Sequence, residues 1–312
     1  MDRMVDAATQ RLLARLATWA QANTRAMKDM SPAQARAMMR SVMECFGLPN
    51  SSLCACDGRA RPVPMRIYRP AEMAQPAPCV AFFHGGGWAM GDVESYHPLV
   101  DRLAAHSGAL FMSVDYRLAP EHPFPAAFED CLAATRWLLS NAVGFGGDPK
   151  RVMVMGDSAG GALAAAVAWA LSRERPDALA GQILLYPLLD IAQPHRTHSS
   201  RKQFGGGDYF LSLTDIDRAA EWYVPDPARR RDPLVSPLLE PDLSGLPKTR
   251  ILTAGFDPLR DEGRLYARRL GDAGVPVSHH CAPTTIHAFL SFRALSAGTR
   301  WRRRIAQWIR AT

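Results

Sequence analysis

A serine between two glycines stands near the middle of the chain. Residues 156–160 read Gly-Asp-Ser-Ala-Gly, with Ser158 at the centre, between an apolar run at 152–155 and a helix-forming run at 162–171. Glycines two positions before and after a serine allow a sharp strand-to-helix turn, because its two arms can pass closely. Such a turn exposes the hydroxyl at a helix N-terminus. We therefore predict that Ser158 is a nucleophile; a tight turn with a bystander serine is the alternative.

A run of three glycines, Gly85, Gly86 and Gly87, follows His84, which comes directly after the apolar run 79–83. No side chain shields their backbone N–H groups, which suits an anion-binding concavity for the oxyanion of a tetrahedral intermediate. The N–H of Ala159, next after the serine, would be a further donor. A phosphate-binding loop is the rival interpretation, but the Gly-Lys-Ser/Thr ending of such loops is absent. We predict an oxyanion hole.

A serine hydroxyl needs a base, and the base needs an acid that fixes its tautomer. On a strand–turn–helix scaffold of this kind the chain order is serine, then acid, then histidine. Asp257 follows the apolar run 250–254, and His287 follows a short run near 275–281. Ser158, Asp257 and His287 are thus the predicted catalytic residues. Residues inside predicted elements compete for the same roles: Asp261 and Glu262 for the acid, His279 and His280 for the base.

The elements that must position these residues alternate between strand and helix. Five short apolar runs each lead into a helix-like segment: 79–83, 109–114, 152–155, 181–186 and 250–254. Continuous apolar strands separated by helices predict a mostly parallel sheet covered on both faces, in the α/β class. Sites in such sheets form beyond the carboxyl ends of the strands. A proline-studded stretch at 63–70 indicates an edge strand.

Two segments are candidates for a helical cap over the site. Residues 1–48 show helical spacing of apolar side chains, and Ser31 followed by Pro32 predicts the start of a second helix. The rhythm of strands breaks at 194–235, which we interpret as a cap or lid insertion; a mobile surface loop is the alternative. Residues 49–312, with that insertion, would form the catalytic domain.

Composition narrows the function classes. The chain has 312 residues, of which 47% are hydrophobic and 21% charged, as in ordinary globular proteins. The net charge of +7 could suggest nucleic acid, but the arginine clusters at 229–231 and 302–304 lack interleaved aromatics and are expected to be solvated. No spacing of cysteine and histidine indicates a metal. The N-terminus lacks a secretory signal and the longest apolar run is too short to cross a bilayer, so we expect no membrane association and a cytoplasmic location.

Taken together, the motifs resemble those of the bacterial hormone-sensitive-lipase family of carboxylesterases. The matching stretches are 84–88, 115–121, 156–161 and 257–262. The resemblance implies an α/β-hydrolase fold with a helical cap, hydrolysis of short- to medium-chain acyl esters, a small-molecule ester substrate and no cofactor. Some relatives form dimers, so a homodimer is one expectation for the assembly.

The resemblance also suggests that Asp115, Tyr116 and Glu121 brace the oxyanion loop, and we interpret His84 as a residue that positions it. The chain departs from the family near the histidine. Where the family usually has glycine, three residues before the histidine and directly after it, this chain has Thr284 and Ala288.

Two other functions compete with the esterase. A ligand-binding receptor on the same scaffold would have lost the catalytic histidine, whereas His287 is present. A long-chain lipase or an amide hydrolase would keep the same catalytic residues and differ only in its substrate.

Overall fold

The protein is built around one central sheet. The computed structural model describes residues 4–23, 29–56 and 63–312. Within them the strands run in the order β1-β2-β4-β3-β5-β6-β7-β8. Their bounds are Cys54–Cys56 (β1), Met65–Pro70 (β2), Ala77–Phe83 (β3), Leu110–Val114 (β4), Gly147–Asp157 (β5), Gly181–Leu185 (β6), Thr249–Phe256 (β7) and Val277–Ile286 (β8). Neighbouring strands from β4 to β8 are parallel, and β1 and β2 are antiparallel to their neighbours.

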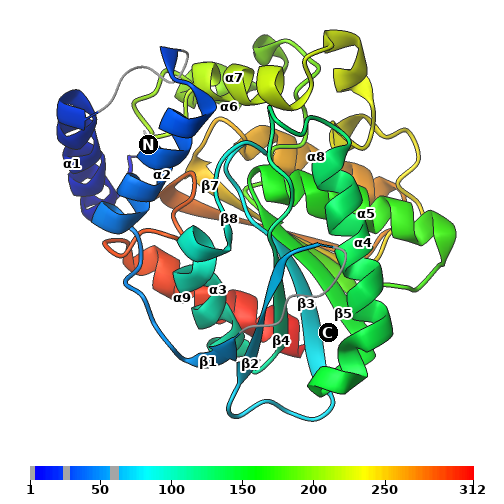
Figure 1. Cartoon of the computed structure of the whole chain (residues 1–312). Coiled ribbons are helices and arrows are strands. Elements are labelled where there is room, and N and C mark those ends of the chain that lie inside the picture. The colour runs from blue at the N-terminus through cyan, green and yellow to red at the C-terminus, as the bar shows by residue number, and fades with distance from the viewer. Residues whose placement is uncertain (1–3, 24–28, 57–62) are drawn as a thin grey trace.

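Helices cover both faces of this sheet. α4 (Ala126–Asn141), α5 (Ala159–Glu174) and α8 (Arg260–Asp272) pack on one face, and α3 (Val93–Ser107) and α9 (Ser296–Arg310) on the other (Figure 1). Every residue of β3, β4 and β6 is buried, because both sides of these strands face helices. The predicted α/β class and mostly parallel sheet are confirmed.

The position of the proline-rich strand differs from the prediction. Residues 63–70 were expected at the sheet edge, but β2 lies between β1 and β4, with Cys54 paired to Pro70. Its prolines are tolerated because Pro64 precedes the strand and Pro70 ends it. The edge beside it is instead the short strand β1.

Four helices from two separate segments lie above the carboxyl ends of the strands (Figure 1). They are α1 (Ala7–Asn23) and α2 (Pro32–Phe46) from the first segment, with α6 (Ser199–Phe204) and α7 (Leu213–Tyr223) from the second. Ser31 caps α2 as predicted, and its hydroxyl accepts from the N–H of Gln34. Parts of the predicted cap segment 1–48, residues 1–3 and 24–28, lie outside the described residues. Short 3-10 helices complete the chain at Ala142–Phe145, His195–Thr197, Pro227–Arg231 and Pro237–Leu239.

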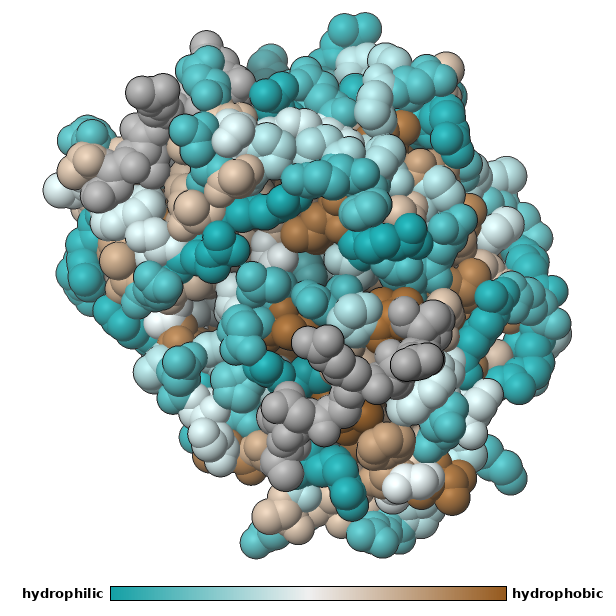
Figure 2. All heavy atoms as spheres, viewed as in Figure 1, coloured by the Kyte–Doolittle hydropathy of each residue, from teal (hydrophilic) through white to brown (hydrophobic). Residues whose placement is uncertain are grey.

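The described surface carries few large exposed apolar side chains, namely Met4, Leu53 and Val143. On the face shown in Figure 2, hydrophilic residues predominate and hydrophobic ones are scattered among them. Within the described ranges, no helix has the length and apolar character required to cross a bilayer.

Candidate active site

Ser158 lies on a sharp turn between β5 and α5. Its φ of 54° is in the left-handed region, which costs energy for a residue with a side chain and is common at strained functional turns. A Cβ on Gly156 would lie 2.1 Å from the carbonyl oxygen of Gly160. A Cβ on Gly160 would lie 2.1 Å from the carbonyl oxygen of Phe83. The two glycines are therefore required by the close approach of the turn to itself and to β3.

Ser158, His287 and Asp257 form one hydrogen-bonded chain. The Nε2 atom of His287 is 2.9 Å from the Ser158 hydroxyl, and its Nδ1 atom is 2.8 Å from the Asp257 carboxylate. Asp257 is completely buried directly after β7, and its other oxygen accepts from the N–H of Leu259 at 2.8 Å. This bond fixes the carboxylate toward the imidazole. Asp257 lies two residues before Leu259, the N-cap of α8.

The competing residues lie elsewhere. The ring of His279 contacts the hydroxyl of Thr253 at 2.9 Å, and His280 stacks on a tryptophan of α9. Asp261 and Glu262 lie in the first turn of α8 and pair with arginines. None of them contacts Ser158 or the ring of His287.

One of the predicted oxyanion donors has another acceptor. The N–H of Gly85 donates to the carboxylate of Asp157 at 2.8 Å, so the assignment of Gly85 as an oxyanion donor is corrected. In the part of the chain that the structure describes, no acceptor is found for the N–H groups of Gly86, Gly87 and Ala159. Gly86 and Gly87 have φ values of 113° and 61°, which only glycine adopts readily. These three N–H groups are available to an anion beside Ser158.

His84 supports this loop from beneath. Its ring is fully buried and stacks on Tyr116, with centroids 4.2 Å apart, and the Tyr116 hydroxyl donates to the His84 carbonyl at 2.7 Å. Burial lowers the pKa of His84, which favours the neutral ring. The backbone N–H of Asp115 donates to the carbonyl of Pro64. This bond joins the start of the segment 115–121 to the residue before β2.

Glu121 is joined to the glycine loop through Arg36 of α2. Its carboxylate pairs with Arg36 of α2 at 2.5 Å. Arg36 in turn donates to the carbonyl oxygen of Ala89, just after the glycine run, at 2.8 Å. Glu121 therefore contributes by orienting the arginine that joins α2 to the loop.

The two departures from the family pattern, Thr284 and Ala288, lie on either side of His287. Ala288 has a φ of 57°, a left-handed conformation in which glycine is favoured. The hydroxyl of Thr284 donates to the carboxylate of Asp6 at 3.2 Å, which ties the loop to the segment before α1. The ring of Tyr186 packs edge-on against His287, with centroids 5.0 Å apart.

Arg302 also supports the histidine loop. The cluster 302–304 was predicted to be solvated, but Arg302 is 4% exposed and donates to the carbonyl of Leu290 at 2.6 Å. Burial lowers its pKa to about 10. That expectation is wrong for Arg302, because its position on α9 faces the core and not the solvent.

A cavity of about 170 Å³ opens at Ser158 and His287. Its wall includes apolar side chains from α2, from α7 and from the segment before α7: Met38, Met39, Val42, Met43, Leu211, Ile216 and Ala219. Among the described residues that line it are the carboxylates Asp157 and Asp215, and none is lysine or arginine. Asp215 accepts from the N–H of Ser212 at 2.9 Å, and burial raises its pKa. The cavity suits a small, mainly apolar group that carries no negative charge.

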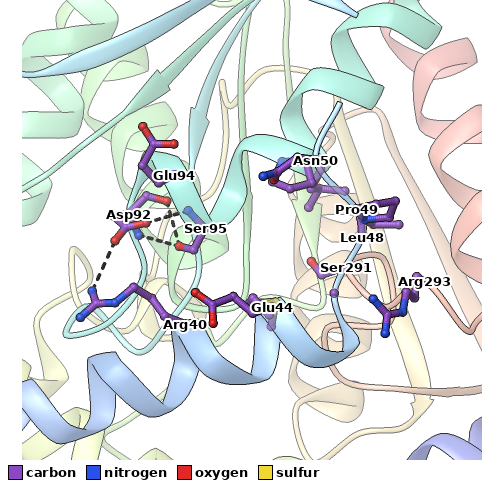
Figure 3. A pocket seen from close by; sticks show the side chains of 14 residues that line it. Arg40, Glu44, Leu48, Pro49, Asn50, Asp92, Glu94, Ser95, Ser291 and Arg293 are labelled. Atoms are coloured by element: carbon purple, nitrogen blue, oxygen red, sulfur yellow. Dashed lines mark hydrogen bonds and ion pairs between the residues drawn. The ribbon is translucent and has the colours of Figure 1, made fainter. Parts of the chain in front are cut away.

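A second, more polar cavity of about 400 Å³ adjoins the first and shares Met43 and Ser291 with it. Figure 3 shows Arg40 and Glu44 on α2, opposite the start of α3, where Arg40 lies 3.7 Å from Asp92. A ligand too large for the cavity at Ser158 would extend into this second, polar cavity. No cluster of metal-ligating side chains occurs among the residues that the structure describes.

A protein-family model described as alpha/beta hydrolase fold matches residues 80–291, from β3 to beyond His287. The chain belongs to the α/β-hydrolase family. This α/β hydrolase is 39% identical over 235 residues to the carboxylesterase NlhH of Mycobacterium tuberculosis, covering 74% of this chain and 72% of the relative. It is 40% identical to the carboxylic ester hydrolase LipN of the same organism, covering 85% and 72%.

Solved structures of ester hydrolases superimpose on this chain over almost its whole length. An ester hydrolase from the metagenome of Lake Arreo, in complex with a bipyridine phosphonate derivative, superimposes with a TM-score of 0.91 at 38% identity and covers 99% of both chains. A thermostable esterase of Pseudomonas putida has a TM-score of 0.90 at 32% identity, covering 99% of this α/β hydrolase and 97% of the esterase.

Proposed function

We propose that Ser158, His287 and Asp257 hydrolyse short- to medium-chain acyl esters through an acyl-enzyme intermediate. The chain is a carboxylic-ester hydrolase by its family and by the esterases it is similar to over most of its length. One observation carries the assignment of the reacting residues: the unbroken chain of hydrogen bonds from the buried Asp257 through His287 to the Ser158 hydroxyl.

The geometry supports a two-step reaction. Ser158 attacks the ester carbonyl while the Nε2 atom of His287 takes the hydroxyl proton, and Asp257 stabilises the imidazolium that forms. The N–H groups of Gly86, Gly87 and Ala159 donate to the oxyanion of the tetrahedral intermediate. His287 then gives the proton to the leaving alcohol. A water molecule repeats the cycle on the acyl-enzyme and releases the acid.

The cavity supports the restricted acyl size. Its volume of about 170 Å³ lies below the roughly 300–1,000 Å³ typical of pockets for drug-sized ligands. Because no lysine or arginine is among the described residues that line it, an acyl group with a carboxylate would find no cationic partner there, and a neutral acyl group is favoured.

The test uses p-nitrophenyl esters from acetate to palmitate. We expect Ser158→Ala to abolish hydrolysis and covalent labelling by a fluorophosphonate. Ser291→Ala, a serine on the wall of the same cavity, is the matched control and should keep both. Full hydrolysis by Ser158→Ala would overturn the nucleophile assignment. A maximum at palmitate would overturn the short-chain preference and favour a lipase.

The same experiment distinguishes the esterase from the competing functions. A ligand-binding protein on this scaffold would not be labelled by the fluorophosphonate, whereas an esterase should be. An amide hydrolase would cleave the matched p-nitroanilides faster than the esters. The cytoplasmic location and the homodimer stay predictions, and size-exclusion chromatography with light scattering tests the second.

A further inference from the structure

Ionisable side chains that the reaction does not use are buried behind the catalytic residues. They are Asp190, His198, Arg201 and Glu262, each at most 3% exposed. They come from the segment after β6, from α6 with the residue before it, and from α8, three parts that meet where the cap rests on the catalytic domain (Figure 1). His198 contacts the Asp190 carboxylate at 3.0 Å, and Arg201 contacts Glu262 at 2.6 Å.

Glu262 connects this cluster to the nucleophile. One carboxylate oxygen accepts from Arg201, and the other accepts from the backbone N–H of Leu189 at 3.0 Å. The neighbouring residue, Leu188, donates its N–H to the carbonyl oxygen of Ser158 at 3.0 Å. The segment that Glu262 holds is therefore the segment that holds the turn of the nucleophile.

The same helix of the cap also holds the turn of the catalytic acid. The hydroxyl of Ser200 donates to the carbonyl oxygen of Pro258, the residue after Asp257, at 2.8 Å. The N–H of Ser200 donates to the Asp261 carboxylate at 2.9 Å, and the N–H of Asp261 donates back to the Ser200 hydroxyl at 3.1 Å. Two neighbouring residues of α6 thus contact both parts of the site: Arg201 contacts Glu262 on the side of Ser158, and Ser200 contacts the turn after Asp257.

We propose that α6 acts as a positioning element for the triad: Arg201, through Glu262, fixes the turn of Ser158, and Ser200 fixes the turn of Asp257. None of the three touches the reacting atoms. The distance between the nucleophile and the acid then depends on how α6 is seated, so the cap contributes to the rate of the chemical step as well as to the wall of the cavity.

The charges explain why a buried arginine is needed at this place. Burial raises the pKa of Glu262 to about 7, while Arg201 and His198 oppose that rise and Asp190 adds to it. A buried ion pair that loses one partner leaves an uncompensated charge, which is far more costly than loss of both partners together. Removal of Arg201 alone should therefore displace Glu262 and the backbone of Leu189 with it.

The experiment is a double-mutant cycle with Arg201→Met, Glu262→Gln and both together, plus Ser200→Ala. Values of kcat and KM are measured with p-nitrophenyl butyrate per active site titrated by a fluorophosphonate, so unfolded protein is not counted. We expect Arg201→Met to lower kcat about tenfold or more with KM within about twofold, because small displacements of reacting groups are costly in rate. The double variant should recover to within about threefold of wild type.

Ser200→Ala removes one oxygen and is the variant most certain to fold; its kcat should fall about threefold or more at unchanged KM. Arg196→Met, an exposed arginine just before α6, is the matched control and should behave as wild type. A wild-type kcat per active site in both Arg201→Met and Ser200→Ala would overturn the proposal. It would also be overturned if KM in these variants rose by the same factor by which kcat fell. The proposal rests on the assigned triad, but it fails separately: retained activity in Ser158→Ala would overturn the triad itself.

Discussion

The N–H of Gly85 donates to the carboxylate of Asp157 across 2.8 Å, so the residue before Ser158 holds the first glycine of the run 85–87. The second carboxylate oxygen of Asp157 accepts from the hydroxyl of Tyr96 at 3.2 Å. This bond sets the position of the loop relative to Ser158. It also leaves Gly86 and Gly87, and not Gly85, to face the site.

Asp157→Asn should show a stability gain that depends on pH. Burial raises the pKa of Asp157 to about 7. The folded protein therefore keeps a proton that the unfolded chain releases at lower pH, and the wild type loses stability as the pH rises from the unfolded pKa through about 7. Asparagine keeps the acceptor for Gly85 and carries no charge. The difference in melting temperature, variant minus wild type, should therefore increase as the pH is raised from about 5 to about 8.

The control for this measurement is Asp272→Asn, which removes an exposed carboxylate at the end of α8. A difference for Asp157→Asn that stays constant from about pH 5 to pH 8 would contradict the raised pKa.

Ala288→Gly should stabilise the protein slightly and keep its activity. A left-handed alanine costs about 1–2 kcal/mol, and glycine gives back about 0.5–1 kcal/mol through its freer unfolded chain. The expected gain in the free energy of unfolding, measured with urea, thus lies between about zero and about 1.5 kcal/mol. Ala282→Gly, in the same strand-and-loop region without a positive φ, should instead destabilise. Destabilisation by Ala288→Gly would show that its methyl group has a packing role that outweighs the strain.

Gly160→Ala should be among the most damaging single-methyl changes in the chain. The added Cβ would approach the carbonyl oxygens of Phe83 and His84 to 2.1 and 2.6 Å, and both are backbone atoms that cannot move aside. Overpacking of this kind costs about 1–3 kcal/mol or more. Gly144→Ala, with no atom within 4 Å of its Cβ, should be close to neutral. Thermal denaturation and ester hydrolysis measure both effects, and a fully active, stable Gly160→Ala would contradict the geometry of the turn.

Leu211→Ala should move the acyl preference toward longer chains. Leu211 lines the catalytic cavity, whereas Leu213, two residues on at the start of α7, does not. Loss of the isobutyl group enlarges the space beside Ser158, so kcat/KM over the p-nitrophenyl series should peak at a longer acyl group. Leu213→Ala is the paired control and should leave the maximum in place. An unchanged maximum in Leu211→Ala would place the acyl group elsewhere in the cavity.

The sequence was informative where a feature is local. The helix N-cap at Ser31 and the buried strands of the sheet are each indicated by residues that are close together in the sequence. The fold class could therefore be predicted. Contacts between distant residues could not: nothing near Gly85 shows that Asp157, far along the chain, takes its N–H. The short strand Cys54–Cys56 has no pattern of its own in the sequence, and the structure shows it paired with β2. Arg302 was misjudged because a run of arginines does not tell which of them faces the core.

The wall of the catalytic cavity on α2 is largely thioether: Met38, Met39 and Met43 stand there together. Methionine has an unbranched, flexible and polarisable side chain, so this wall can reshape around straight and branched acyl groups with little cost. The same chemistry makes the enzyme sensitive to oxidants. Peroxide converts a thioether into a polar, chiral sulfoxide. Exposure to it should therefore narrow the range of esters accepted well before it unfolds the protein, and methionine sulfoxide reductase should restore that range.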